Sequence, residues 1–204
     1  MELAPIILFV YNRPWHTERT LQALKLNHLA NQSKLYVYCD GPKADASEET
    51  RKKIDEVRAL VANGDWCKEV ILRERNENRG LAANVIEGIT EVINEHGRVI
   101  VLEDDLITAP YFLTYCNEGL DLYKDVSNVY SINGYQFPMQ VDEADTFLSP
   151  QATSSWGWAT WKDRWEHFEI EATQKDTIVS SDHLTRRFNL ADYNYVGMLG
   201  LYFH

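Results

Sequence analysis

Four apolar runs, each followed by a stretch with helical spacing, most constrain how this chain can fold. The runs cover residues 4–11, 34–39, 69–72 and 98–102. Helical patterns follow them at residues 15–29, 48–61, 81–97 and 110–124. Repeated strand–helix units require right-handed crossovers and an open, mostly parallel sheet with helices on both faces. The sequence therefore predicts an α/β fold, with a fifth strand at residues 128–132.

Two residues are placed to cap the predicted helices. Ser47 stands directly before the second helix and is followed by acidic residues in the first turn, which is typical of a helix start. Gly97 closes the third helix, where a glycine can adopt the left-handed conformation of a carboxyl cap.

Polar residues follow each of the four strands. They are Asn12 and Arg13, then Asp40, then Asn78 and Arg79, then Glu103, Asp104 and Asp105. Ligands of open α/β sheets lie outside the carboxyl ends of the strands, so these residues are expected to meet at one edge. Simpler interpretations remain open: an acidic triplet can be a solvated turn, Asp-Gly-Pro is an ordinary turn sequence, and Asn78 can cap a helix.

Composition and charge exclude several classes of partner. The 204 residues carry a formal net charge of −11, with 20 Lys and Arg against 31 Asp and Glu, which disfavours nucleic acid and anionic lipid as ligands. Cys39, Cys67 and Cys116 are widely spaced, as expected of reduced thiols. No signal peptide or membrane-spanning stretch is evident, so a cytoplasmic protein is expected.

The pattern changes after residue 133. Residues up to 152 read as loop with short strands, and four Trp then occur in the ten residues 156–165. Trp161 and Trp165 have helical spacing, which favours the core, whereas Trp156 and Trp158 flank a glycine. The apolar ending YVGMLGLYFH suggests either missing downstream sequence or a tail that pairs with a second copy.

Five segments follow one another along the chain in this order: APIILFVYNRPWHTERTLQAL, VYCDGP, ENRGLAANVIEGI, VIVLEDDLITAPYF and SSWGWATW. Together they resemble nucleotide-sugar-dependent glycosyltransferases of the GT-A fold, in particular the β-1,2-N-acetylglucosaminyltransferase I family and its bacterial sugar-transferase relatives. The likeness covers residues 4–168, and the acidic segment with its following Ala-Pro is the most specific part. It implies residues 1–133 as a nucleotide-sugar-binding region and 134–204 as an incomplete acceptor-side region of the same domain.

The resemblance also implies roles for individual residues. In the family's strand-end acidic motif (the DXD motif, here EDD), the last carboxylate, Asp105, binds Mn²⁺ or Mg²⁺, and the preceding Glu103 and Asp104 contact the ribose and donor sugar. Arg13, with Asn12 beside it, matches the residue that contacts the diphosphate. Further donor-pocket residues are implied at Asp40, which faces the nucleobase, at the turn Asn78, Arg79 and Gly80, and at the loop Trp156, Gly157 and Trp158.

The implied activity is transfer of a sugar, with inversion, from a UDP-sugar or related donor to a glycan or lipid-linked acceptor. The family's context suggests bacterial surface-polysaccharide assembly. A divalent cation would stabilise the leaving diphosphate, and a carboxylate would deprotonate the acceptor hydroxyl. No residue matches the family's base, and the candidates are Asp163, Asp182 and Asp192.

Two alternatives stay open at this point. A sugar-1-phosphate nucleotidyltransferase shares the strand–helix alternation, but its Gly-rich loop after the first strand is absent from NRPWHTER. A noncatalytic donor- or metal-binding module is the second alternative, since the missing base would leave binding without turnover.

Overall fold

The computed structural model describes residues 2–135, 154–189 and 194–197. It divides into two compact units, Met1–Phe137 with Ser154–Glu166, and Pro138–Thr153 with His167–His204. The first unit alternates strands and helices in the order β1 (Ile6–Val10), α1 (Pro14–Lys25), β2 (Lys34–Cys39), α2 (Glu48–Asn63), β3 (Glu69–Glu74), α3 (Leu81–His96), β4 (Arg98–Glu103) and α4 (Phe112–Leu122). A short 3₁₀ turn, Ala30–Gln32, precedes β2, and the unit closes with β5 (Ile132–Asn133), β6 (Trp158–Trp161) and α5 (Lys162–Trp165).

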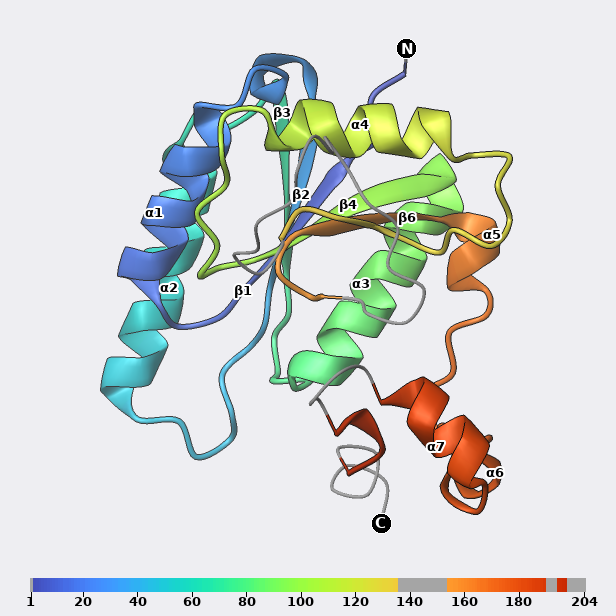
Figure 1. Cartoon of the computed structure of the whole chain (residues 1–204). Helices are drawn as coiled ribbons and strands as arrows, with labels where there is room; N and C mark the ends of the chain where they lie inside the picture. Colours follow the sequence, from blue (N-terminus) through green and yellow to red (C-terminus); the bar gives the residue numbers. More distant parts are fainter. Residues whose placement is uncertain (1, 136–153, 190–193, 198–204) are drawn as a thin grey trace. The chain divides into compact units, whose positions relative to one another are not determined.

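The strands form one six-stranded sheet in the order β3-β2-β1-β4-β6-β5 (Figure 1). Strands β1 to β4 pair in parallel, whereas β6 runs antiparallel to both β4 and β5. The chain moves outward from β1 to β2 and β3, then returns to place β4 on the other side of β1. The sheet therefore has its topological switch point between β1 and β4, where ligands of open α/β sheets bind.

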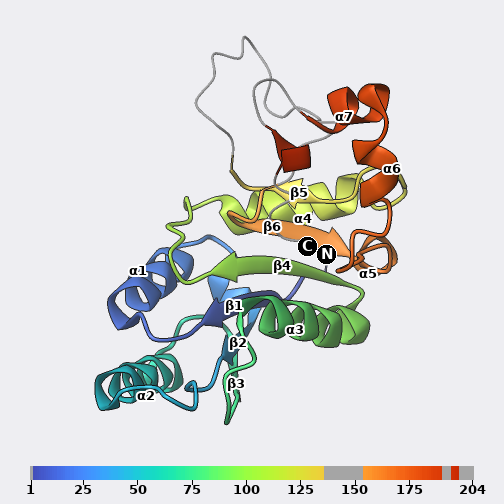
Figure 2. The same ribbon diagram turned by 90° about the horizontal axis from the view of Figure 1, so that it is seen from below.

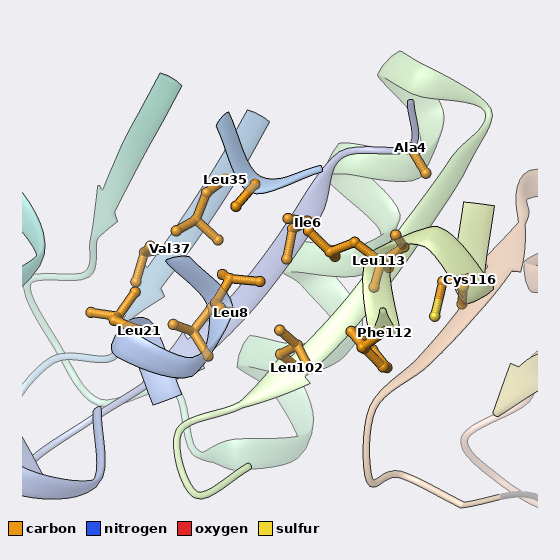
Figure 3. Close-up of a cluster of buried hydrophobic side chains, with 14 of the residues drawn as sticks. Ala4, Ile6, Leu8, Leu21, Leu35, Val37, Leu102, Phe112, Leu113 and Cys116 are labelled. Carbon is orange, nitrogen blue, oxygen red and sulfur yellow. The ribbon is translucent and has the colours of Figure 1, made fainter. Parts of the chain in front are cut away.

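Helices cover both faces of the sheet, as Figures 1 and 2 show. On one face, side chains of α1, α2 and α4 pack with alternate residues of the strands, among them Leu8, Val37 and Leu102 (Figure 3). On the other face, α3 packs on the intervening strand residues, such as Phe9 and Val101. All five residues of β1 are buried, because a central parallel strand is covered from both sides. The predicted α/β class with a mostly parallel sheet is confirmed.

The predicted helix caps are confirmed. Ser47 Oγ accepts a hydrogen bond from the backbone N–H of Thr50 at 3.2 Å and so caps α2. Gly97 ends α3 with φ of +75°, a left-handed conformation that glycine adopts without the strain a Cβ would bring.

Two sequence-based assignments are wrong in detail. The strand expected at residues 128–132 is reduced to Ile132–Asn133, because the backbone N–H groups of Val126 and Val129 bond within turns, to Tyr123 and Val126 respectively. Trp161 is buried as expected, but it belongs to strand β6 rather than to a helix. The loop and short strands expected up to residue 152 fall largely outside the described residues, as does the apolar ending proposed for pairing.

The second unit contributes two short helices, α6 (Lys175–Val179) and α7 (Asp182–Phe188). Ser181 caps α7 by accepting a hydrogen bond from the backbone N–H of Leu184 at 3.3 Å. Within the described part of the chain, no helix has the length and apolar character that crossing a membrane requires. The functional division predicted at residue 133 stays a prediction.

Candidate functional site

The candidate site begins in the crevice between β1 and β4, where Arg13 meets two carboxylates. Arg13 Nε donates to Asp104 Oδ2 at 3.3 Å, and its Nη2 forms an ion pair with Asp104 Oδ1. The same Nη2 lies 3.1 Å from Asp105 Oδ2. One guanidinium thus holds together two acids that follow β4, at the switch point of the sheet.

The three acids of the EDD segment differ in how far they are buried. Asp104 is 4% exposed, and burial raises the pKa of its carboxyl, against the opposing hydrogen bond from Arg13. Burial also raises the pKa of Glu103, and the charges of Asp105 and Asp104 add to that rise. The side chain of Asp105 is 44% exposed. The cluster therefore presents Asp105 to solvent as its accessible carboxylate, backed by Asp104 and Arg13.

Asp40 organises the loop that precedes α3. Its Oδ1 accepts hydrogen bonds from the backbone N–H groups of Gly41 at 2.9 Å and Arg79 at 2.8 Å. Its Oδ2 accepts from Asn78 Nδ2 at 3.0 Å and from the Gly80 N–H at 3.2 Å. Four donors occupy the four acceptor positions of a carboxylate. A contact between Asp40 and a nucleobase, which stays a prediction, would require one of these bonds to be exchanged.

The strand-end residues thus form two groups on either side of β1. Arg79 Nη2 pairs with Glu87 of α3 at 2.7 Å on the exposed surface, and Asn12 lies in the bend between β1 and α1. Because one strand separates Asp40 from Asp104, the two groups lie roughly 10 Å apart, two interstrand spacings. All four strand ends meet at one edge, as predicted.

An open cleft of about 680 Å³ adjoins Asp105 at the start of α4. Apolar and aromatic side chains make up most of its wall, namely Leu106, Ile107, Ala109, Tyr111, Phe112, Tyr115, Tyr135 and Trp156. Among the described residues that line the cleft, Asp105 alone is charged. An apolar, concave wall with few polar groups is typical of a small-molecule site. We refer to it as the aromatic cleft.

A glycine turn shapes one wall of the aromatic cleft. Gly157 has φ of +76°, and a Cβ at this position would lie 3.1 Å from the ring of Phe112. Trp156, the residue before it, is 51% exposed and contacts Tyr135 edge-on, with ring centroids 4.5 Å apart. The positive φ and the close approach of Phe112 therefore disfavour a side chain at position 157, and the turn holds Trp156 at the cleft.

The two Trp residues predicted for the donor pocket separate in the structure. Trp156 lines the aromatic cleft, whereas Trp158 lies in β6 and packs in the hydrophobic cluster on the α3 side of the sheet. Its ring centroid is 6.2 Å from that of Trp165. Trp156 precedes β6, and the left-handed turn at Gly157, with φ of +76°, lies between the two tryptophans, which explains why residues so close in sequence have different surroundings.

Asn27 supports the site and was missed by sequence reasoning. Its Oδ1 accepts a hydrogen bond from the Leu113 N–H at 3.1 Å, in the first turn of α4. Its Nδ2 donates to Thr108 Oγ1 at 3.0 Å and to the Ala23 carbonyl at 3.1 Å. Asn27 is buried, and it fixes the loop between β4 and α4 to the end of α1. An Asn after a helix would be interpreted as a local cap, so no sequence signal points to this long-range role.

Of the three candidate catalytic bases, the structure allows only Asp163 to be compared with the cleft. Asp163 follows β6, whose residue Trp161 pairs with Arg98 at the opposite end of β4 from Asp105, and it forms an ion pair with Arg164. Asp182 opens α7 in the second unit. Asp192 lies outside the described residues. The topology therefore gives Asp163 no place at the cleft, and the other two stay predictions.

The residues fit a divalent cation bound mainly through one carboxylate. Among residues 2–135, 154–189 and 194–197, no three His, Cys, Asp or Glu side chains are grouped to hold a metal ion. Asp105 offers a half-exposed carboxylate at the mouth of the cleft, and oxygen ligands of this kind suit Mg²⁺ and Mn²⁺. Mg²⁺ is commonly bound through one or two carboxylates plus substrate phosphates. The arrangement fits that mode of binding.

Comparisons with known proteins give structural likeness only. No protein-family model matches this chain, and no curated protein sequence matches it. The galactosyltransferase LgtC, solved with donor and acceptor sugar analogues, aligns over 97% of this chain and 70% of its own, at 10% identity and a TM-score of 0.49. TarS of S. aureus aligns over 77% of this chain at 12% identity and a TM-score of 0.45.

This chain spans 28% of the TarS chain. At 10–12% identity and TM-scores below 0.5, these likenesses say nothing of this chain's activity.

Proposed function

We propose that this chain is a metal-dependent glycosyltransferase that takes a sugar from a nucleoside-diphosphate-sugar, in the first instance a UDP-sugar. The observation that carries the proposal is the cluster of Arg13, Asp104 and Asp105 at the switch point, opening directly into the aromatic cleft. A diphosphate needs positive charge and a sugar needs an apolar wall, and the two lie side by side here. The narrower relationship to the β-1,2-N-acetylglucosaminyltransferase I family stays a prediction.

Each part of the site has its own role in the proposed transfer. Arg13 donates from a planar guanidinium, which suits the oxygens of a diphosphate. Asp105 would hold a Mn²⁺ or Mg²⁺ ion, which when bound supplies Lewis-acid stabilisation of the leaving diphosphate. The aromatic cleft would orient the donor sugar on Trp156, whose ring offers an apolar face to the C–H groups of a sugar. Asp40 would keep the loop before α3 in place as a wall of the nucleotide pocket.

Inversion and acceptor activation complete the proposal. An inverting transfer needs a carboxylate on the side of the sugar away from the diphosphate, to take the proton of the acceptor hydroxyl. The described lining of the cleft contains one carboxylate, Asp105, which faces the diphosphate side. That observation favours a second candidate function, a donor-binding module that does not turn over. Transfer to a glycan or lipid-linked acceptor is the outcome that distinguishes an enzyme from such a module.

Thermal unfolding with a nucleotide panel tests the binding half of the proposal. UDP at 100 times its dissociation constant, measured against the protein in the same Mn²⁺ buffer, is expected to add about 2.7 kcal/mol to stability, or roughly 5–10 °C in Tm for a chain of this size. Asp105→Asn should remove the metal-dependent part of the shift. Asp55→Asn, an exposed carboxylate on α2, is the matched control and should keep it. No shift with any nucleoside diphosphate and either cation would refute the proposal.

Release of UDP from a UDP-sugar tests the catalytic half. An enzyme is expected to release UDP faster when an acceptor is added, whereas a noncatalytic module binds the donor and releases none. The measurement uses the full 204-residue chain with Mn²⁺ and a panel of UDP-sugars. Binding without release would establish the module in place of the enzyme.

A further inference from the structure

A second hollow continues the aromatic cleft along α4. It measures about 330 Å³ and is lined by α4 residues and by Ile132 of β5. Tyr115 lines both hollows, so the two adjoin at that side chain. We call the second hollow the α4 groove.

The α4 groove is part of a mostly apolar stripe on the exposed side of the helix. Tyr111, Tyr115 and Leu122 are all exposed, Leu122 by 70%, and they recur at the spacing of one helix face, with the exposed Glu118 between Tyr115 and Leu122. The stripe runs about 16 Å from Tyr111 to Leu122, at 1.5 Å per residue. It starts at the mouth of the aromatic cleft beside Asp105 and leads away from the crevice that holds Arg13.

The charges along the groove select the chemistry of its occupant. Its described lining contains two acids and no Lys or Arg: Glu118 is exposed, and Asp121 is paired with Arg98. The described lining offers no cation to a phosphate or a carboxylate, and Arg98 beside it is already paired with Asp121. The remaining lining, which includes Leu122, Tyr123 and Ile132, is suited to a hydrocarbon or aryl group.

We propose that the acceptor is a glycoside with an apolar aglycone, its sugar beside the donor sugar in the aromatic cleft and its aglycone in the α4 groove. This inference rests on the proposed function, because it takes Asp105 as the end at which transfer occurs. The groove begins at the cleft, where the acceptor sugar must lie, and continues over a length that a chain of several methylenes fills. Adjacency to the site through Tyr115, rather than exposure alone, favours an acceptor over a protein partner.

Matched pairs of methyl and hexyl glycosides test the proposal without knowledge of the acceptor sugar. Dissociation constants are measured by calorimetry for glucose, galactose and N-acetylglucosamine glycosides, in the presence of UDP and Mn²⁺. A fully buried methylene is worth about 0.8 kcal/mol, or roughly fourfold in affinity. An open groove buries about half of that area, so five added methylenes should tighten binding about 30-fold. Equal affinities of methyl and hexyl glycosides, with UDP still bound, would overturn the inference.

Two leucine variants test whether the preference for hexyl over methyl glycosides arises from the α4 groove. Leu122→Gln should reduce the hexyl-to-methyl ratio at least threefold, while the affinities for the methyl glycoside and for UDP stay unchanged. Leu26→Gln, an equally exposed leucine just after α1, is the matched control and should keep the ratio. A ratio unaffected by Leu122→Gln would overturn the assignment to the groove.

The other outcomes are also decisive. A dimer in sedimentation experiments that Leu122→Gln dissociates would mean that a second copy covers the groove, and it would overturn the acceptor. If the unmodified chain does not bind UDP, the proposed function itself is refuted. In that case a remaining preference for hexyl glycosides would mark an apolar ligand site and not an acceptor site.

Discussion

Replacing Arg13 with Met tests how the site holds its buried acid. Asp104 is 4% exposed and takes both of its close ion-pair contacts from Arg13. Removing one partner of a fully buried ion pair costs about 3–5 kcal/mol. The side chain of Arg13 is 43% exposed, so water can reach Asp104 once the guanidinium is gone, and we expect a loss of about 2 kcal/mol. For a chain of this size that corresponds to roughly 4–8 °C in Tm.

The loss is expected to depend on pH with a definite sign. The pKa of Asp104 is raised in the folded protein, chiefly by burial. A raised carboxyl pKa stabilises the fold below the ordinary pKa of Asp, and that stabilisation is lost as the pH rises through the raised value. Without Arg13 the pKa rises further. The deficit of Arg13→Met should therefore be largest near neutral pH and should shrink as the pH falls and Asp104 becomes protonated.

Urea unfolding at several pH values in EDTA measures the effect without a bound metal. The double variant Arg13→Met, Asp104→Asn removes the buried charge along with its partner, so it should regain at least about 1 kcal/mol over the single variant. Arg19→Met, on the exposed side of α1, is the control and should cost less than about 1 kcal/mol through its contact with Trp15. Equal deficits at pH 4 and pH 7.5, or a double variant no more stable than the single one, would refute the reasoning.

Three further substitutions have defined outcomes. Gly157→Ala must place a Cβ at φ of +76° beside Phe112, so it should destabilise by about 1–2 kcal/mol in urea unfolding and weaken glycoside binding. Asp40→Asn keeps the shape but exchanges an acceptor oxygen for a donor facing backbone N–H groups, so it should weaken UDP binding in calorimetry more than it weakens glycoside binding. Asn27→Ala leaves the Leu113 N–H and its neighbours unpaired, so it should cost about 1–3 kcal/mol, and unchanged stability would contradict its positioning role.

The sheet could be predicted from the sequence because its central strands are buried on both faces. Such strands read as continuous apolar runs, and the helices between them carry one apolar side each. The prediction of a fifth strand at residues 128–132 was wrong because an apolar run was again interpreted as a strand. Val129 and Ile132 are apolar, but the turns at residues 123–129 already satisfy the backbone there, and only two residues pair with β6. Apolar composition alone does not distinguish a strand from a turn that covers the core.

The location of the site could be predicted from the sequence, but the hydrogen bonds and ion pairs between its residues could not. Strand ends in a parallel sheet meet at one edge, so Arg13, Asp40 and Asp105 could be assigned to it from topology alone. Which polar atoms bond to which depends on pairs far apart in the chain: Arg13 and Asp104 are 91 residues apart, and Asn27 and Leu113 are 86 apart. No periodicity in the sequence encodes such a pair.

The structure also explains why three adjacent acids can coexist after β4. Side chains alternate between the faces of a strand, so Glu103 continues the α3 side while Asp104 turns to the side of α1 and meets Arg13. Asp105 lies beyond the strand and keeps a half-exposed carboxylate at the aromatic cleft. Mutual repulsion is reduced because the charge of Arg13 lies against both Asp104 and Asp105. The segment is therefore not a set of three equal ligands, and a cation at Asp105 would have to complete its coordination with oxygens of the donor and of water.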